Sequence, residues 1–402
     1  MSTLTEPSWP NVRLGDVGQS LIGLTYSPSS VKRSGTLVLR SSNIQDGSLA
    51  FDDNVYVDCA VPEKIRVREN DILICVRNGS RRLIGKSVIL DRRVVGQTFG
   101  AFMAVYRSPS NPFLQYFFQS EDFKRQIDQH LGATINQITN GSLNSFVVAL
   151  PTAPEQQAIT ASLQDADRLI ATLERLIAKK QAIKQGMMQQ LLTGRTRLPG
   201  FEGEWTVTPV GSLARVTGGG TPSTGVSSYW GGGIPWFTPA EISSGGAGLV
   251  ATSERTITQD GLANSAATLL PEGSVLVTSR ASIGNCAVAA VPVATNQGFT
   301  SMIPRDRRST WFLYYWVQQY RAEFESRSAG STFLEISASK VAAIPLAAPG
   351  LPEQQAIGEV LRDADTELDA LKSRLAKARA IKAGMMQQLL TGRTRLPVEA
   401  AS

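Results

Sequence analysis

The chain has 402 residues, of which 42% are hydrophobic and 18% charged, and these proportions are typical of soluble globular proteins with two or three domains. Lys and Arg number 40 against 34 Asp and Glu, and the net charge of +6 is compatible with a polyanionic partner. The chain has no apolar run as long as a membrane span, and residues 1–10 lack the pattern of a secretory signal. We therefore expect a cytoplasmic protein that makes no membrane contact.

The cysteines and the charges are unevenly placed. Cys59, Cys75 and Cys286 lie far apart and form no Cys-x-x-Cys pair, so the sequence predicts neither a disulfide framework nor a zinc site. Residues 1–200 contain 23 basic and 17 acidic side chains, whereas residues 201–402 contain 17 of each. The first half is therefore expected to attract phosphate more strongly.

The first globular block spans roughly residues 16–150. Its short apolar runs are bounded by Gly, Asn, Pro and Ser, which predicts strands of a mixed sheet, and residues 112–131 have the pattern of a helix. Residues 77–82 read RNGSRR at a predicted strand turn, where guanidinium groups suit phosphate or guanine and an amide suits adenine. A solvated turn with no ligand is the alternative for this loop. The predicted strands are 36–44, 71–77, 86–90 and 101–107.

A helical block follows the first globular block. It begins after Pro154 with Glu155 beside it and stops near Gly194, and its apolar residues alternate at spacings of three and four. That spacing is typical of a coiled-coil seam, and about 38 residues at 1.5 Å each give roughly 57 Å. The predicted seam residues are Leu163, Ala166, Ile170, Leu173 and Ile177.

The second globular block spans roughly residues 212–348 and differs from the first in nearly all of its sequence. Apolar runs at 274–280 and 285–293 predict strands, and residues 310–327 predict a helix, so each block is expected to be α+β. Gly, hydroxyl and aromatic residues gather at 218–236, where GGGTPS is followed by YWGG and IPW. This segment suits a nucleic-acid contact, and packing within the block is the alternative.

A second helical block repeats the first. Residues 384–397 read GMMQQLLTGRTRLP, as do residues 186–199, an offset of 198, and PEQQAI occurs at 154–159 and again at 352–357. Two matched seams in one chain can bury each other, so we expect an intramolecular helix pair; a homodimeric coiled coil is the alternative. The seam residues of the second copy are Leu361, Ala364, Leu368, Leu371 and Leu375.

The repeated MMQQLL segments follow Gly186 and Gly384, which interrupt the helical pattern at a cost of about 1 kcal/mol each. Two interpretations stay open for their apolar side chains. They either belong to a core or form a repeated docking surface for two copies of one partner. The docking candidates are Met187, Met188, Leu191, Met385, Met386 and Leu389.

Motifs for catalysis are incomplete. Residues 79–87, GSRRLIGKS, have five residues between the glycines where a phosphate-binding loop has four, and a strand-like VIL follows. His130 is the only histidine, which excludes catalytic triads and multi-histidine metal sites. Ser337 to Lys340 spells S-x-x-K without its companion motifs, and Asn111-Pro112-Phe113 lacks the second proline of an amino-methyltransferase motif. A nuclease or ATPase is therefore disfavoured.

Several ordered motifs resemble the specificity subunits of type I restriction-modification systems, over nearly the whole chain. They are PEQQAI followed by a long helix and LLTGRTRLP, twice; LVLRSSNIQDG at 37–47; GGGTPS with YWGGGIPW at 218–236; and TSRASIG with TNQGF at 278–299. Each motif alone is modest, whereas the ordered set is specific.

The resemblance implies an α+β fold in which two mixed α/β target-recognition domains are separated by two long helices. These helices pair as an antiparallel intramolecular coiled coil with pseudo-twofold symmetry. The implied domains are target-recognition domains at 1–153 and 200–351, spacer helices at 154–199 and 352–397, and a short tail at 398–402.

The resemblance also implies a function without catalysis by this chain. Each head reads one half of a bipartite double-stranded DNA target, and the helices set the spacer and dock two modification (methyltransferase) subunits. Those subunits bring S-adenosylmethionine, restriction (translocase and nuclease) subunits bring ATP and Mg, and this chain binds no cofactor and no metal. A coiled-coil adaptor with two protein-binding heads is the competing interpretation.

The loops and the matching motifs together give candidate DNA-contacting residues in both heads. The first head is the more basic, and Arg77, Arg81, Arg82 and Lys86 are its expected phosphate or base contacts. The full set is Arg40, Ser41, Asn43, Arg77, Asn78, Ser80, Arg81, Arg82, Lys86, Thr221, Ser223, Tyr229, Trp230, Trp236, Arg280, Ser282, Asn296 and Gln297.

Overall fold

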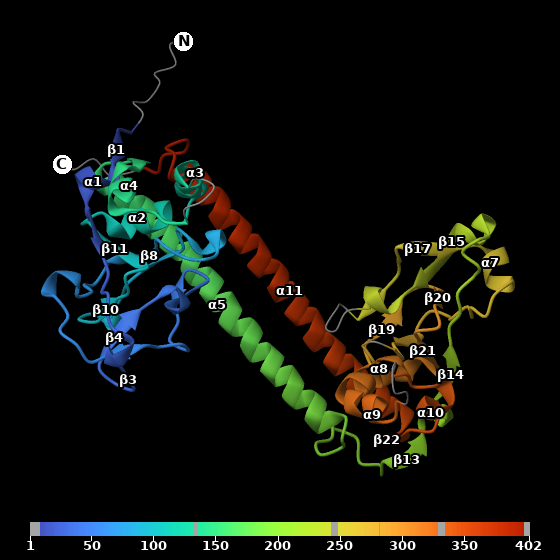
Figure 1. Ribbon diagram of the computed structural model, residues 1–402. Helices are drawn as coiled ribbons and strands as arrows, with labels where there is room; N and C mark the ends of the chain where they lie inside the picture. Colours follow the sequence, from blue (N-terminus) through green and yellow to red (C-terminus); the bar gives the residue numbers. More distant parts are fainter. Residues whose placement is uncertain (1–8, 132–135, 243–247, 281, 329–333, 398–402) are drawn as a thin grey trace. The chain divides into compact units, whose positions relative to one another are not determined.

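The computed structural model divides the chain into two compact units (Figure 1). The first unit contains residues 1–172 and 376–402, and the second contains residues 173–375, so each unit holds one head and a part of both long helices. None of the helices in the described ranges is both long and apolar enough to cross a bilayer. The structure describes residues 9–131, 136–242, 248–280, 282–328 and 334–397.

The head of the first unit contains two four-stranded sheets. One is antiparallel with the order β2-β11-β8-β9, and the other has the order β10-β4-β7-β3, with β10 and β4 parallel. Two small ladders, β1-β12 and β5-β6, complete the head. The strands are β1 Asn11–Arg13, β2 Gln19–Ile22, β3 Val31–Lys32, β4 Thr36–Leu39, β5 Ile44–Gln45, β6 Ser48–Leu49, β7 Tyr56–Val57, β8 Ile72–Cys75, β9 Ser87–Ile89, β10 Thr98–Phe99, β11 Met103–Arg107 and β12 Val147–Ala149.

The single helix expected at 112–131 is wrong in extent, because the chain forms two helices there. Ser120 accepts a hydrogen bond from the backbone N of Phe123 at 3.3 Å and so starts a new helix. The break turns Phe118 and Phe123 toward Tyr106 in one buried aromatic cluster. The short helices of this head are α1 Leu14–Val17, α2 Asn111–Phe117, α3 Glu121–His130 and α4 Asn140–Ser145.

The head of the second unit contains a five-stranded sheet, β14-β21-β18-β19-β16, and a three-stranded sheet, β17-β15-β20. The helix expected at 310–327 is again two helices, which meet at Tyr320. The strands are β13 Thr206–Pro209, β14 Ala214–Gly218, β15 Trp230–Phe237, β16 Leu249–Val250, β17 Arg255–Ile257, β18 Val275–Val277, β19 Cys286–Ala289, β20 Ala294–Thr295, β21 Thr300–Pro304 and β22 Pro345–Ala348. The helices are α6 Val210–Leu213, α7 Gln259–Ala263, α8 Thr310–Gln319, α9 Arg321–Ser326 and α10 Ala338–Ala342.

Two long helices confirm the prediction from the repeat. Helix α5 spans Ala153–Leu191 and α11 spans Leu351–Leu389, 39 residues each. Gly194 and Gly392 lie just beyond the helix ends with φ of +69° and +70°, a conformation that favours glycine. Gly186 and Gly384 do not interrupt the helices, since a glycine in a helix interior only lowers stability.

Parts of the two helices pair inside each unit (Figure 1). In the first unit Ile159 and Leu163 of α5 share a hydrophobic cluster with Leu389 and Leu390, which end α11 and follow it. In the second unit the start of α11 packs in the same way against the end of α5. The pairing is thus antiparallel and intramolecular, as expected. Leu163, Leu173, Ile177, Leu361, Leu368 and Leu371 of the seam are buried, and Ala166, Ile170, Ala364 and Leu375 are half-buried.

One polar triad, which we name a brace, joins the helices to the head in each unit. In the first brace the Asp167 carboxylate accepts the Tyr116 hydroxyl hydrogen at 3.0 Å and pairs with the Lys382 ammonium at 2.6 Å. Burial, reinforced by the Asp167 charge, raises the pKa of Tyr116 far above its usual range, so its hydroxyl remains a donor.

The second brace repeats this arrangement with Tyr315, Asp365 and Lys184. The Asp365 carboxylate accepts from the Tyr315 hydroxyl at 2.7 Å and pairs with the Lys184 ammonium at 2.5 Å. The two lysines occupy equivalent positions of the repeat, and each reaches the aspartate of the other helix. Each brace therefore fixes the register between the helices next to one head.

The repeated LLTGRTRLP segments close the heads. Trp9 stacks on Gly392, and its Nε1 donates to the Glu155 carboxylate at 3.1 Å; Arg395 lies 5.5 Å from the Trp9 ring. The second unit repeats this contact, since Trp205 stacks on Gly194 and Arg197 pairs with Glu353 at 2.5 Å.

Three of the six residues that were predicted to dock a partner lie in the hydrophobic clusters of the two units. Met188, Leu191 and Leu389 are buried in the hydrophobic clusters of the two units and are therefore core residues, which was the alternative interpretation. Met187, Met385 and Met386 are half-buried, and for these three docking stays a prediction. Periodicity could not separate the two roles because both give apolar residues at helical spacing.

Replacing Asp365 by Asn is predicted to lower the free energy of unfolding of the second unit by about 1–3 kcal/mol, because the Lys184 ammonium loses its charged partner. The matched control is Asp363→Asn on the exposed side of the same helix turn, which should change stability by less than about 0.5 kcal/mol. Urea unfolding of the purified chain measures both. Equal effects would contradict the brace.

Candidate nucleic-acid interface

The two heads place their candidate loops at equivalent strand ends. Leu39 of β4 pairs with Phe99 of β10 in a parallel ladder, as Phe237 of β15 pairs with Thr295 of β20. Gly100, which follows β10, donates its backbone N–H to Leu39 O at 2.9 Å. In the same way Asn296, which follows β20, donates to Phe237 O at 3.0 Å. The candidate loops are therefore comparable position by position.

This equivalence includes two arginines. Arg77 forms an antiparallel bridge with Gln137, and Arg280 forms the same bridge with Glu335. The preceding residues, Val76 and Ser279, donate their backbone N–H to Phe102 O and Gly298 O at 3.1 and 2.8 Å. Arg77 and Arg280 thus occupy one position of the fold, as do Phe102 and Gly298.

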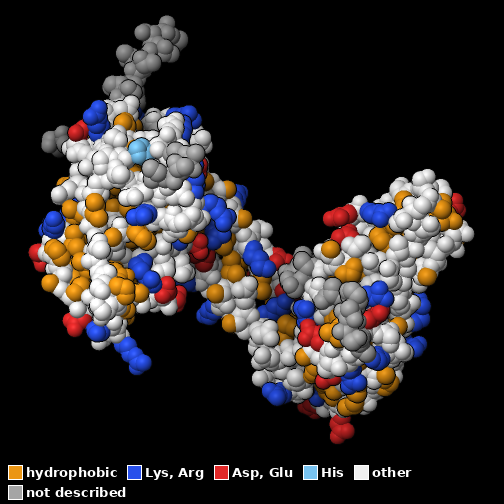
Figure 2. Space-filling model, viewed as in Figure 1, with side chains coloured by type: hydrophobic (Ala, Val, Ile, Leu, Met, Phe, Trp, Pro, Cys, Tyr) orange, Lys and Arg blue, Asp and Glu red, His pale blue; other side chains and the backbone are white. Residues whose placement is uncertain are grey.

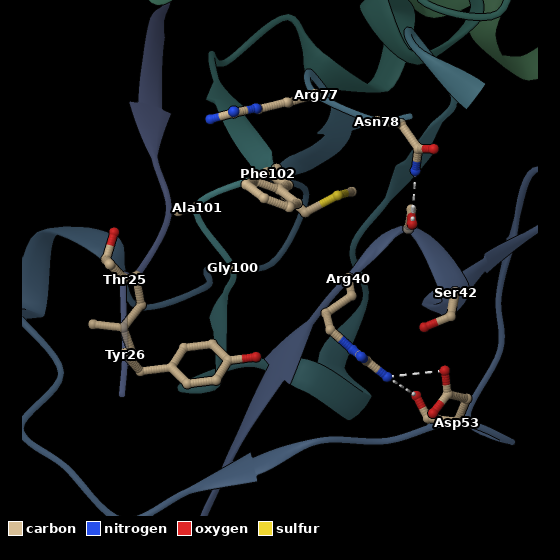
Figure 3. A pocket seen from close by; sticks show the side chains of 13 residues that line it. Thr25, Tyr26, Arg40, Ser42, Asp53, Arg77, Asn78, Gly100, Ala101 and Phe102 are labelled. Carbon is tan, nitrogen blue, oxygen red and sulfur yellow. Dashed lines mark hydrogen bonds and ion pairs between the residues drawn. The ribbon is translucent and has the colours of Figure 1, made fainter. Parts of the chain in front are cut away.

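A cavity of about 450 Å³ opens between these loops in the first head (Figure 3). Tyr26 and Phe102 flank it, Arg77 lies over Phe102, and the Arg40 side chain points to Asp53. It brings together four candidates that are up to 38 positions apart in sequence, namely Arg40, Ser41, Arg77 and Asn78. No sequence pattern indicated a cavity, because its walls come from five separate segments of the chain.

Arg40 carries the most constrained charge of the cavity. Its Nη2 pairs with the Asp53 carboxylate at 2.9 Å, while Arg40 Nε and Ser42 Oγ are buried without a hydrogen-bond partner among the described residues. Buried polar atoms usually find a partner, so these two atoms suit a polar ligand at this edge.

Asn43, which the sequence predicted to contact DNA, is buried inside the first head. It is fully buried, its Oδ1 accepts from the backbone N of Arg40 at 2.9 Å, and its Nδ2 donates to Ala50 O at 2.9 Å. The side chain therefore holds the loop from within. A motif match cannot distinguish a loop-supporting amide from a ligand-facing one.

Phe102 and Asn78 shape the other side of the cavity. The Arg77 guanidinium carbon lies 5.0 Å from the centroid of the Phe102 ring, and 59% of the Phe102 surface is exposed. Asn78 Nδ2 donates weakly to Ser41 Oγ at 3.5 Å, and its Oδ1 accepts the backbone N–H of Ser80 at 3.0 Å. Sequence reasoning missed Phe102, whose only signal is a large apolar residue in a tight turn.

The basic turn beside the cavity is partly neutralised. Arg81 pairs with Asp128 at 3.3 Å, Arg82 is exposed, and Lys86 is half-buried. On the face drawn in Figure 2, basic and acidic side chains are interspersed over both units. This face therefore shows no extended patch of a single sign of charge.

The loop of the second head is held by its aromatic residues. Trp236 is buried and donates through Nε1 to Gly220 O at 2.9 Å. It therefore supports the loop from within, in place of the direct contact with nucleic acid that the sequence predicted. Trp230 packs edge-on against it with centroids 5.1 Å apart. Arg255 lies 3.5 Å from the Trp230 ring centroid; sequence reasoning missed it because a lone arginine in a strand matches no motif.

The remaining candidates of the second head are mostly engaged by their neighbours. Thr221 Oγ1 donates to Gln297 Oε1 at 2.5 Å, Arg280 pairs with Glu335 at 2.9 Å, and Asn296 Oδ1 accepts from Gly298 N at 2.8 Å. Exposed Ser223 receives the Trp230 Nε1 hydrogen bond on its carbonyl oxygen, at 3.1 Å. Tyr229 and Ser282 are half-buried in the same loops.

The motifs considered for catalysis have structural roles here. The segment 79–87 forms a short 3-10 turn and leads into β9, so it contains no helix that could cradle phosphate. Ser337 caps α10 by accepting the Lys340 N–H at 3.4 Å, and the His130 ring packs against Phe146. Over the described ranges, no three His, Cys, Asp or Glu side chains are grouped to hold a metal ion.

Comparison with known families decides the relationship. The protein family described as "Type I restriction modification DNA specificity domain" matches the chain twice, at residues 7–185 and 202–378. The chain belongs to this family. Both specificity domains thus contain one head together with most of the long helix that follows it.

Curated relatives of the specificity-domain chain carry matching names. It is 38% identical over 160 residues to the type I restriction enzyme MjaIX specificity subunit of Methanocaldococcus jannaschii, covering 39% of this chain and 37% of that protein. It is 27% identical over 248 residues to the EcoR124I/EcoR124II specificity subunit of Escherichia coli, covering 60% of each. The match to the putative MjaX specificity subunit of Methanocaldococcus jannaschii, at 23% identity, covers 93% of this chain and 90% of that one.

Solved structures show the same fold. The type I restriction-modification S subunit from M. genitalium aligns with a TM-score of 0.61 at 14% identity, covering 97% of this chain and 98% of that one. The HsdS subunit from Thermoanaerobacter tengcongensis aligns with a TM-score of 0.51 at 20% identity, covering 97% and 98%. Two α/β heads with two long paired helices are therefore the architecture of the specificity-domain chain.

Replacing Gly220 by Ala is predicted to destabilise the second head by about 1–3 kcal/mol, because a Cβ there would lie 2.3 Å from the backbone of Ala266. Gly218→Ala in the same glycine run is the control, since its Cβ would meet only Phe299 O at 3.9 Å, and it should change stability by less than about 0.5 kcal/mol. Urea unfolding of both variants measures the difference. Equal tolerance of the two substitutions would refute the close loop packing.

Proposed function

We propose that this chain is the DNA specificity subunit of a type I restriction-modification complex, in which each head reads one half-site of a bipartite double-stranded target. The observation that carries the proposal is a common head architecture with different side chains at equivalent loop positions. Arg77 and Arg280 share one position, and so do Phe102 and Gly298. A shared frame with exchanged contact residues is what reading two different half-sites requires.

The proposed contact surface of the first head is the cavity and the adjoining basic turn. Arg77, Asn78 and Arg40 supply donors for base edges, and Arg81, Arg82 and Lys86 supply positive charge for phosphate. In the second head the proposed contacts are the exposed or half-exposed candidates of the loops around Gly220 and Gln297. These are Thr221, Ser223, Tyr229, Trp230, Arg280, Ser282, Asn296 and Gln297.

The proposed division of labour follows the expected domains. Residues 1–153 and 200–351 act as recognition domains, the spacer helices at 154–199 and 352–397 set the distance between half-sites, and 398–402 form a tail. Two modification subunits dock on the helical region, with Met187, Met385 and Met386 among the contacts. Restriction subunits join that complex.

Chemistry in this proposal belongs to the partners. The modification subunits bring S-adenosylmethionine, the restriction subunits bring ATP and Mg, and this chain acts in the cytoplasm without a catalytic site of its own. The family match supports this account over an adaptor that binds proteins with both heads, since the matched family is described as a DNA specificity domain.

Sequencing of methylated adenines tests the function directly. A host that expresses this chain with its modification subunit is predicted to methylate one asymmetric motif made of two defined half-sites and an unspecified spacer. Expression of either subunit alone is the control and should give no such motif. Absence of methylation by the correctly assembled pair would overturn the proposal.

The basic turn gives a second test. Replacing Arg81 and Arg82 by Ala in the assembled methyltransferase is predicted to weaken target binding and to reduce the slope of log affinity against log salt by about 0.9 for each phosphate that is no longer neutralised. Arg307→Ala with Arg308→Ala is the control, because these two arginines precede α8 and lie outside the candidate loops of both heads. An unchanged affinity and slope for the first pair would remove the turn from the interface.

A further inference from the structure

We infer that Arg77 determines a guanine in the half-site read by the first head, and that Phe102 positions it. The inference rests on the proposed function and deepens it, by assigning one base to one side chain. The two heads share an arginine at one position of their common architecture but differ at two of its neighbours, where Gln137 corresponds to Glu335 and Phe102 to Gly298.

The Arg77 guanidinium group is stacked on a ring and is not neutralised by a carboxylate of the described residues. Among these residues it forms no ion pair and no side-chain hydrogen bond, whereas Arg40 pairs with Asp53 and Arg81 with Asp128. The guanidinium carbon instead lies 5.0 Å from the Phe102 ring centroid, a distance that allows cation–π attraction. The five N–H donors of Arg77 are therefore available to a ligand.

The stacking contact orders Arg77 in advance. A planar guanidinium held against an aromatic ring loses less conformational freedom on binding than a solvated arginine does. Figure 3 shows Arg77 and Phe102 at one rim of the cavity, and Arg82, which is also exposed, has no ring beside it among the described residues. Arg77 is thus the arginine of this head best prepared for directional recognition.

The second head lacks this arrangement at the equivalent position. Arg280 pairs with Glu335 at 2.9 Å, where the first head has the neutral Gln137. Phe102 is replaced by Gly298, where a Cβ would lie 2.7 Å from Pro239, so this position cannot carry a ring. One arginine is stacked and available, and the other is neutralised by its neighbour.

Guanine is the base that this geometry fits. Its O6 and N7 atoms form a paired acceptor edge in the major groove, and a guanidinium fork donates to both at once. Adenine presents a donor beside its N7 and would leave one Arg77 N–H facing another donor. The exposed Phe102 ring additionally offers apolar contact to a neighbouring thymine methyl group.

The test pairs protein variants with base analogues in the assembled methyltransferase. First, the methylated motif of the wild-type complex is determined; then each guanine of both half-sites is replaced in turn by 7-deazaguanine, which lacks the N7 acceptor. At one guanine this change is expected to weaken wild-type binding about fivefold or more. The Arg77→Ala variant should bind the unmodified duplex about 5- to 150-fold more weakly and be insensitive to that same analogue.

Three further variants keep the result interpretable. Arg77→Lys retains the charge and should keep the salt slope while losing the guanine preference; Phe102→Ala should relax the preference and Phe102→Tyr should retain it. Arg93→Ala is the matched control, because Arg93 also lies over a ring, that of Phe51, but is held by Asp91 at 2.7 Å. It should keep full sensitivity to every analogue.

The possible outcomes distinguish a failure of the Arg77 assignment from a failure of the proposed function. A wild-type complex that shows no bipartite motif contradicts the proposed function itself. A clear motif in which Arg77→Ala remains sensitive to the analogue at every guanine refutes the inference alone. A motif without guanine in either half-site also refutes it.

Discussion

Each brace pairs an aspartate of one long helix with a lysine of the other. The rest of the structure depends on this constraint. Lys382 reaches Asp167 beside the first head, and Lys184 reaches Asp365 beside the second. The first head is consequently completed by a segment distant in sequence, residues 376–402, whereas the second head is completed by residues 173–199, which directly precede it. This explains why GMMQQLLTGRTRLP is kept unchanged in both copies while the heads differ: it must meet the same brace, the same glycine-tryptophan contact and the same buried cluster twice.

A fixed frame of this kind leaves the loops at the strand ends free to vary. Equivalent backbone hydrogen bonds hold Arg77 and Arg280 in one position, yet their neighbours make one guanidinium available and the other engaged. A few side chains around each loop, such as Phe102 or Arg255, thus change the groups that the loop presents without altering the fold. In energetic terms, the frame supplies stability through buried apolar area, and in the proposed function the loops would supply discrimination through directional hydrogen bonds.

The elements predicted from the sequence were those governed by periodicity. The heptad spacing and the duplicated ends predicted both long helices and their mutual pairing, because a narrow apolar seam must be covered. Periodicity failed where a local cap decides, as at Ser120, which breaks a predicted helix in two. It also left the role of Met188 open, because a core and a docking surface have the same pattern. Phe102 and Arg255 were missed since their importance comes from neighbours on other strands.

Methylation by a chain with two copies of one head tests the central claim most directly. Residues 16–150 would be replaced by residues 212–348, which leaves both braces' aspartates and lysines in place but removes Tyr116 in favour of a second copy of Tyr315. Because the two heads share one architecture and meet equivalent helix ends, the proposed function predicts that the adenine-methylated motif becomes an inverted repeat of the second half-site. An assembled complex that keeps an asymmetric motif, or methylates no bipartite site at all, would contradict the account.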